Sequence, residues 1–294
     1  QYTPAMSASY RDFGTWHGAE WLRRGVGLYF DNSMPKRSFS TVTTSAYERE
    51  DGVIVPSCGI WNHRAYLKRI WVLHKQLFNP RTPQIMMIHM TNTQVLPYHG
   101  WNQVNLDLEW MRKRPNEAMF QAKFGHDLLR VQSTGLQTGN IPTAMTSRPR
   151  APQHVPQEWL DEHGHRYNQI ARLALLVHEV NPSIGGRPYP EPLDEFGYGL
   201  PDCRVVNYWS DDSPLSVSDE QCKWLLLQRD EALMIVLCTW NPEASEVTLR
   251  LDAEALDVSL GEAVDANSGE VLPMEDHRVT VSMEGHGARI IRLE

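Results

Sequence analysis

The chain has 294 residues, 41% of them hydrophobic, which is enough for one large domain or two smaller ones. Its formal net charge of −8 is spread without long charged runs, which argues against nucleic acid and against a membrane surface as the main partner. No stretch approaches the ~20 apolar residues of a membrane span. Residues 1–4 lack the basic and apolar regions of a signal peptide, and the compartment stays open, with a secreted or periplasmic location favoured.

The first part of the chain alternates helix-like and strand-like segments. Residues 9–24 have apolar side chains at helical spacing and predict a helix. Residues 26–32 are a short apolar run, which predicts a fully buried strand that ends on Asp31. A polar loop over residues 33–56 is long enough to be a functional loop or lid. Residues 61–78 predict a second helix.

Further strand-like segments and one long helix follow. The helix is expected over residues 159–180, and Pro142 weakens the prediction of one strand. After about residue 215 the pattern changes to short strands separated by turn signals, which is typical of a small antiparallel β-sandwich. The strands expected before that point are residues 84–89, 103–109, 141–146 and 203–209.

These elements predict an α/β fold, with a partial (β/α)8, TIM-like barrel over residues 1–215 and a small antiparallel β-sandwich over residues 216–294. A closed parallel barrel needs eight strands. The sequence supplies five, which would be strands four to eight. An open five-stranded α/β sheet is the alternative, but the glycine-rich turn of a Rossmann-type sheet is missing. We favour the C-terminal portion of a barrel enzyme, completed by a second polypeptide or cleaved from it.

Acidic residues follow three of the predicted strands. Asp31 ends the first, Asp107 and Glu109 lie on the third, and Asp211 with Asp212 follow the fifth. Since side chains alternate along a strand, Asp107 and Glu109 are expected to point to the same side. Glycoside hydrolysis needs two carboxyl groups that flank one sugar bond, and acids at separate strand ends supply them. The alternatives are that Asp31 caps a turn and that Asp107 or Glu109 pairs with a surface cation.

Hydrogen-bonding groups and aromatic rings are interleaved around these acids. A pyranose presents hydroxyl groups at its edge and apolar C–H groups on its faces, so this mixture suits an oligosaccharide, polysaccharide or glycoside substrate. For His89 alone, a hydrogen-bonded core histidine is the alternative. The substrate-binding candidates are His89, Asn92, His99, Trp101, Trp110, Arg148 and Trp209.

Other chemistries have less support. The four cysteines lack Cys-x-x-Cys spacing, and His163 and His165 would lie on different helix faces, so neither a metal site nor a cofactor is predicted. Cys222 and Cys238 are expected to be buried thiols. Cys58 could be a nucleophile at a helix start, but no histidine is placed to help it.

Several short motifs resemble a known group of enzymes. They are GLYFDN at 27–32, IHMTN at 88–92 and LDLE at 106–109. These segments resemble the later barrel strands of bacterial glycoside hydrolases grouped around glycoside hydrolase family 123. The segments DANSGEVLP at 265–273 and HGARII at 286–291 are similar to the β-sandwich that closes many such enzymes. The resemblance spans most of the chain.

The resemblance implies roles for the acids. In retaining barrels of the alpha-galactosidase type, an Asp on the fourth strand is the nucleophile and an acid on the sixth is the acid/base. By this likeness Asp31 attacks and Glu109 protonates, with Asp107 in reserve for either role. The three strand motifs lack the adjacent Asp-Glu pair on which the substrate-assisted mechanism of family 123 relies.

A non-catalytic role is the rival hypothesis. The chain would then be a carbohydrate-binding or assembly subunit of a larger sugar-processing complex, which keeps the fold and needs its partner for chemistry. An α/β hydrolase or transferase with an unrecognised site is a third hypothesis.

Overall fold

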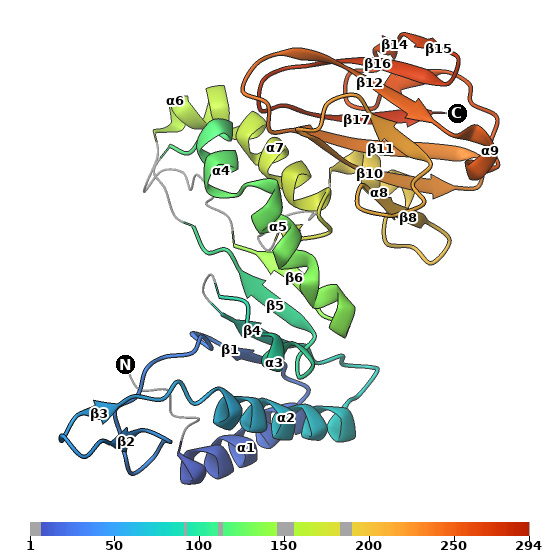
Figure 1. Ribbon diagram of the computed structural model, residues 1–294. Helices are drawn as coiled ribbons and strands as arrows, with labels where there is room; N and C mark the ends of the chain where they lie inside the picture. The colour runs from blue at the N-terminus through green and yellow to red at the C-terminus, as the bar shows by residue number, and fades with distance from the viewer. Residues whose placement is uncertain (1–6, 91–92, 111–113, 146–155, 183–189, 294) are drawn as a thin grey trace. The chain divides into compact units, whose positions relative to one another are not determined.

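The computed structural model describes residues 7–90, 93–110, 114–145, 156–182 and 190–293. The chain divides into two compact units (Figure 1). Unit 1 is Gln1–Glu109 with Thr134–Met145, and unit 2 is Trp110–Ser133 with Thr146–Glu294. No helix among the described residues combines the length and the apolar character needed to cross a bilayer.

Two helices of unit 1 confirm the predicted helices. They are α1 (Ala8–Arg23) and α2 (Ile60–Leu77). The two helices approach closely at glycines of α1. A Cβ at Gly14 would lie 2.6 Å from the Tyr66 hydroxyl, and a Cβ at Gly18 would lie 2.9 Å from Ile70 Cδ1. A larger side chain at either position would have to displace the tip of Tyr66 or of Ile70.

A five-stranded sheet confirms the predicted parallel α/β arrangement. Its order is β1-β4-β5-β6-β7, and the pairs from β1 to β6 are all parallel. The N–H of Ile141 donates to the carbonyl of Gln103, just before β5, and the N–H of Met145 donates to that of Asp107, so Pro142 does not remove a donor of these ladder bonds. The strands are β1 (Leu28–Phe30), β4 (Met86–His89), β5 (Val104–Asp107), β6 (Ile141–Ala144) and β7 (Asn181–Pro182).

The prediction that the first strand is fully buried was wrong. Tyr29 is 52% exposed, and Leu28 and Phe30 are half-buried. Within the described part of the chain β1 pairs only with β4, which leaves its other edge open. Leu28 and Phe30 pack against Tyr66 and Met86, so the helices cover one face of β1, while Tyr29 points to the other.

The remaining elements of this region are short. The polar loop after β1 contains a two-stranded hairpin, and a single helical turn precedes β5. A 3-10 helix leads into β6. These elements are β2 (Tyr47–Glu48), β3 (Ile54–Val55), α3 (Leu96–His99) and η2 (Ser133–Thr138).

Unit 2 begins with helices. The predicted helix over residues 159–180 is confirmed as a continuous helical region that includes one π-helical segment. Its expected apolar face is buried at Tyr167, Ile170, Leu173, Val177 and Val180. The helices are α4 (Glu117–Lys123), α5 (His126–Gln132), α6 (Gln157–Trp159), η3 (Leu160–Gly164), α7 (His165–Leu176) and α8 (Glu191–Phe196).

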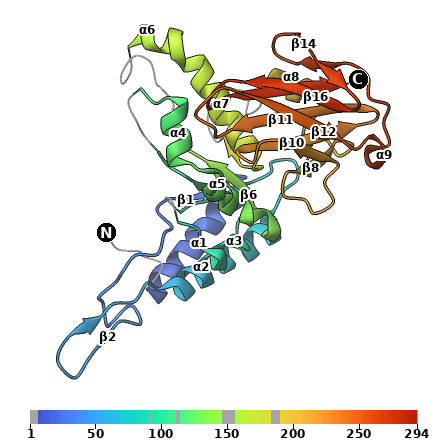
Figure 2. The same ribbon diagram turned by 45° about the horizontal axis from the view of Figure 1, so that its top comes forward.

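The predicted β-sandwich is confirmed in the rest of unit 2. A six-stranded sheet has the order β14-β13-β17-β11-β10-β8, and a four-stranded sheet has the order β15-β16-β12-β9. Figure 2 shows strands of both sheets, among them β11 and β16. Buried side chains from both sheets share one core, among them Leu226, Ile235, Leu249 and Val281. Removing this apolar surface from water holds the sheets together.

The strand bounds within the sandwich follow the alternating pattern of the sequence. A short helix, α9 (Ala253–Leu256), follows β12. The strands are β8 (Arg204–Asn207), β9 (Leu215–Val217), β10 (Cys222–Arg229), β11 (Ala232–Thr239), β12 (Ser245–Leu251), β13 (Ala263–Asp265), β14 (Val271–Leu272), β15 (Met274–Glu275), β16 (Arg278–Met283) and β17 (Ala288–Leu293).

One strand was assigned to the wrong sheet. The segment 203–209 was expected to be the fifth parallel strand, but β8 pairs antiparallel with β10, with Val206 opposite Leu226. The fifth strand in the order of the parallel sheet is β7. Asp211 and Asp212 therefore follow a sandwich strand. The division into domains at residue 215 stays a prediction, but β8 belongs to the sandwich.

Burial lowers the pKa of two histidines, His63 and His178. His63 on α2 is 7% exposed, with its ring centroid 4.9 Å from that of Tyr98. His178 is fully buried, and the Ala174 carbonyl accepts from its Nδ1 at 2.8 Å. Burial lowers the pKa of each histidine to about 4, because the charged imidazolium loses its hydration.

We expect the free energy of unfolding to fall as the pH drops from 6.5 towards 4. In this window the unfolded chain binds protons that His63 and His178 do not take up in the folded state. Each histidine contributes a slope of up to ~1.4 kcal/mol per pH unit. Denaturant unfolding at pH 7 and pH 4.5 measures the fall. It should be smaller in His63→Leu and unchanged in the control His165→Leu, which alters an exposed residue. Equal falls in both variants would contradict the prediction.

Candidate active site

Four side chains meet where the first three parallel strands of unit 1 end. Asp31 directly follows β1, His89 ends β4, and Glu109 lies two residues after β5. The Asp31 Oδ1 atom lies 3.0 Å from His89 Nδ1, and Glu109 Oε2 lies 3.7 Å from His89 Nε2. The fourth member is Tyr29, whose hydroxyl lies 2.8 Å from His89 Nδ1 and 3.3 Å from Asp31 Oδ1. Two carboxyl groups thus lie on opposite nitrogens of one imidazole ring.

The strand register explains why these side chains share a face. Phe30 is opposite Ile88, so the next residues, Asp31 and His89, point to the same side of the sheet. His89 is in turn opposite Leu106. The carboxyl ends of parallel strands lie at one edge, which in α/β barrels is the edge that carries the active site.

The expectation that Asp107 and Glu109 point to the same side rests on an alternation that the structure breaks. Leu106 shares the face of His89, so Asp107 points to the opposite face. Asp107 is 1% exposed and accepts a hydrogen bond of 2.9 Å from Gln94 Nε2. Leu108 then takes a left-handed backbone conformation (φ 53°), which ends the strand, and Glu109 reaches His89.

Hydrogen bonds hold Asp31 in its charged form. Partial burial acts to raise the pKa of this carboxyl. The backbone N–H of Asn32, the Tyr29 hydroxyl and His89 outweigh burial and lower the pKa below its ordinary value. The Asn32 amide also donates to Oδ2 at 2.8 Å. Asp31 is 54% exposed at its side chain, so an anionic carboxylate is presented to solvent.

The pKa of Tyr29 is shifted in the opposite direction, upwards. Burial and the negative charge of Asp31 raise the pKa of Tyr29 to about 12. The hydroxyl therefore keeps its proton at neutral pH and acts as a donor towards Asp31. Tyr29 was not among the predicted site residues. The signal was present, because residues i and i+2 of a strand share a face, and Tyr29 lies two positions before Asp31.

His89 occupies the centre of the cluster. Its side chain is 4% exposed, and its Nδ1 has two oxygen neighbours. Its buried Nε2 makes no hydrogen bond among the described residues and faces Glu109. His89 is thus buried, as the alternative interpretation held, but its hydrogen bonds connect it to the acids.

Two other candidates lie at the end of α3 and just after it. Arg64 Cζ and Lys68 Nζ lie 5.0 Å and 5.2 Å from the centroid of the Trp101 ring. The ring therefore makes cation–π contacts with two residues of α2. His99 is fully buried, and burial lowers its pKa. Neither ring nitrogen of His99 has a hydrogen-bond partner in the described residues. The structure brings neither residue to the Asp31–His89–Glu109 cluster.

The remaining candidates belong to unit 2 or fall outside the description. Trp110 is 9% exposed and packs edge-to-face on Phe124, with ring centroids 5.5 Å apart. Trp209 is half-buried, and Arg130 Cζ lies 4.0 Å from the centroid of the Trp209 ring. Asn92 and Arg148 lie outside the described residues. Of the predicted site, the structure therefore assembles Asp31, His89 and Glu109.

The described residues hold four free thiols and no candidate metal site. In the described ranges no group of three or more His, Cys, Asp or Glu side chains could hold a metal ion. All four cysteines fall within these ranges and are unpaired. Cys222 and Cys238 are buried, as expected, and burial raises the pKa of both thiols. Cys58 is exposed just before α2.

A family model matches part of the chain. Residues 191–278 match the model described as the C-terminal domain of glycoside hydrolase 123. The match runs from the first residue of α8 to the first residue of β16. It confirms the resemblance to family 123 for this part of the chain. No protein in the curated set matched the sequence.

Solved structures of glycoside hydrolases are similar in fold. A variant of Abp, a GH27 β-L-arabinopyranosidase from Geobacillus stearothermophilus in complex with arabinose, has a TM-score of 0.57 at 10% identity, and wild-type Abp has 0.55 at 10% identity. Each match covers 98% of this chain and 62% of Abp. The maltogenic α-amylase AmyB from Thermotoga neapolitana has a TM-score of 0.48 at 11% identity, over 97% of this chain and 66% of AmyB.

The two Abp matches establish the fold class. Their relation to this chain confirms an α/β fold of the kind found in TIM-barrel glycoside hydrolases with a C-terminal β domain. This chain spans about 62% of the length of Abp.

We expect Tyr29→Phe to raise the pKa of Asp31, because the variant loses the hydroxyl that donates to Oδ1. Titration of the aspartate side-chain carboxyl carbons by NMR measures the shift. Tyr47→Phe, which alters an exposed tyrosine of the β2–β3 hairpin, is the matched control. An Asp31 pKa that is the same in wild-type and Tyr29→Phe protein would rule out the hydrogen bond as its cause.

Proposed function

We propose that the chain is the catalytic part of a glycoside hydrolase in which Asp31 is the nucleophile and Glu109 is the general acid/base. The observation that carries the proposal is the convergence of both carboxyl groups on His89 at the carboxyl ends of β1, β4 and β5. The match of residues 191–278 to a glycoside hydrolase domain and the fold likeness to GH27 support the class of enzyme.

Asp31 has the properties that a nucleophile needs. Its lowered pKa keeps it anionic at neutral pH, and its exposure lets a sugar approach. Tyr29 and Asn32 donate to its two oxygens and so fix the orientation of the carboxylate. In this mechanism Asp31 attacks the anomeric carbon and forms a glycosyl-enzyme, which water then hydrolyses.

In the proposal Glu109 serves the leaving group. It lies across the buried His89 ring from Asp31 and is partly exposed, so a sugar must lie over the exposed side of this ring to contact both acids. Glu109 gives its proton to the leaving oxygen and later takes one from water. A retaining mechanism requires the carboxyl groups to be ~5–5.5 Å apart around the substrate, against ~6.5–9.5 Å for an inverting one.

The parallel strands fit the second part of a barrel. We propose that β1, β4, β5, β6 and β7 are its strands four to eight, and that strands outside this chain pair with the open edge of β1. A second polypeptide, or a further segment of a longer one, would supply them. The exposure of Tyr29 supports this proposal, and so does the pairing of β1 with β4 alone among the described strands.

We expect Asp31→Asn and Glu109→Gln each to lower kcat/KM by roughly 10²-fold or more, since each removes one acid of the pair. Hydrolysis of aryl glycosides measures the effect. Glu109→Gln should be least damaging on an aryl glycoside with an acidic phenol, because that leaving group departs without a proton.

Two further variants define the site. Asp51→Asn, at an exposed acid of the β2–β3 hairpin, is the control and should leave turnover unchanged. Asp107→Asn tests the reserve acid and should have a smaller effect than Asp31→Asn, because Asp107 lies on the opposite face. Full activity of both Asp31→Asn and Glu109→Gln would refute the enzyme proposal and favour the carbohydrate-binding or assembly subunit.

We also expect the native particle to contain more than this chain. Native mass spectrometry should give a mass above 33.7 kDa, from a longer polypeptide or from a second one that carries the missing strands. A lone monomer of 33.7 kDa would exclude a barrel completed from outside the chain.

A further inference from the structure

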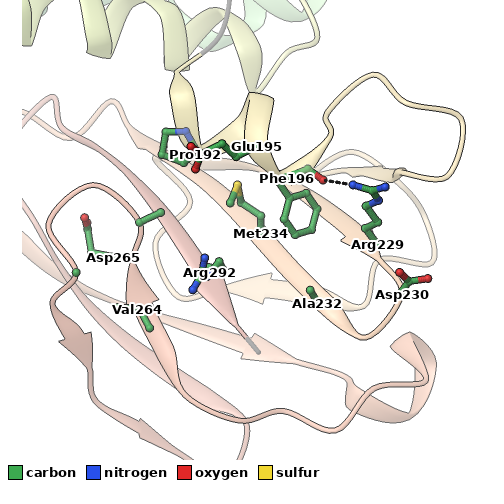
Figure 3. Close-up of a pocket in the computed structure, with 12 residues that line it drawn as sticks. Pro192, Glu195, Phe196, Arg229, Asp230, Ala232, Met234, Val264, Asp265 and Arg292 are labelled. Carbon is green, nitrogen blue, oxygen red and sulfur yellow. Dashed lines mark hydrogen bonds between the residues drawn. The ribbon is translucent and has the colours of Figure 1, made fainter.

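A pocket lies on the outer face of the six-stranded sheet, within unit 2. Its volume is about 470 Å³, within the usual range for sites that bind small ligands. Figure 3 shows it between helix α8 and the strands of the sheet, with Phe196 on the helix and Met234 and Arg292 on the strands. None of its residues belongs to the Asp31–His89–Glu109 cluster.

The floor of the pocket is fixed by strand register. Arg292 on β17 is opposite Met234 on β11 and opposite Val264 on β13, so these side chains form one row across adjacent strands. Their sequence neighbours Leu233 and Leu293 belong to the core between the sheets. The row therefore points away from the core, and its exposed guanidinium stands between two apolar side chains.

The walls add an aromatic ring and two acids. Glu195 and Phe196 come from α8, and Asp230 comes from the turn between β10 and β11. Both acids are exposed, and Phe196 is half-buried. The wall thus places carboxylate acceptors beside an apolar surface.

Two further charged residues of the pocket, Arg229 and Asp265, are held by ion pairs and hydrogen bonds. Arg229 is paired with Asp202 at 2.9 Å. Asp265 accepts from Arg289 at 3.1 Å and from backbone N–H groups of its own turn. The exposed charged residues that line the pocket are Arg292, Glu195 and Asp230, so both signs of charge are present.

We infer that this pocket binds a neutral saccharide. Arg292 would donate to sugar hydroxyls, Glu195 and Asp230 would accept from them, and Phe196 with Val264 would cover the apolar C–H face of a ring. Charges of both signs fit a neutral polyhydroxyl ligand better than an anion, which would be repelled by the two acids. The site is separate from the proposed hydrolytic centre and does not depend on it.

The test uses full-length protein with Asp31→Asn as background, so that hydrolysis cannot consume the probe. Saturation-transfer NMR measures binding of L-arabinose, D-galactose and maltose, with D-glucuronate as a charged probe. Glu195→Gln, Phe196→Ala and Arg292→Gln are added one at a time, and thermal melts confirm folding. Arg278→Gln, which alters an exposed arginine of the other sheet, is the control.

We expect at least one neutral sugar to bind with a dissociation constant in the millimolar range, and Phe196→Ala or Arg292→Gln to weaken it by roughly tenfold or more. Arg278→Gln should have no effect. The inference is overturned if no neutral sugar binds, if glucuronate binds more tightly than all of them, or if every pocket variant binds as the background protein does. Since the measurement involves no turnover, its result is independent of the assignments of Asp31 and Glu109.

Discussion

The register of the parallel sheet is the constraint on which the candidate site depends. Because Phe30 is opposite Ile88, the residues that follow them, Asp31 and His89, end on one face and at one edge. A slip of one residue between β1 and β4 would send one of the two to the face that packs on the helices. The buried imidazole could then no longer connect the acids, so the chemistry rests on backbone pairing before it rests on any side chain.

The same alternation organises both units. In the parallel sheet Leu28 and Phe30 face the helices while Tyr29 and Asp31 face the cluster. In the sandwich, strands β11 and β17 turn Leu233 and Leu293 inwards and Met234 and Arg292 outwards. Each sheet thus uses one face for the free energy of burial and leaves the other for polar groups that can meet a ligand.

The spacing of apolar residues along the sequence predicted those features that depend on neighbouring residues alone. The helices, the strand positions and the burial of Tyr167 and its neighbours follow from apolar periodicity, and the acids at strand ends follow from reading where those runs stop. The direction in which strands pair does not follow from this spacing, because a parallel strand and an antiparallel strand can have the same apolar run. For this reason β8 was assigned to the wrong sheet. The exposure of β1 depends on which strands pair with its edge, and the burial of Trp110 depends on how Phe120 and Phe124 of the following helical segment pack on its ring. Tyr29 enters the cluster through a contact with His89, 60 positions away.

One backbone torsion has an energetic consequence. Leu108 is not a glycine, yet it has a φ of 53°, a conformation that costs an L-residue of order 1–2 kcal/mol. Its side chain is 2% exposed, so burial offsets that cost and locks the torsion in place. The chain thus gives up some folding free energy at the position that separates Asp107 from Glu109. A β-branched or polar residue there would lose either the torsion or the burial, and the direction of Glu109 with it.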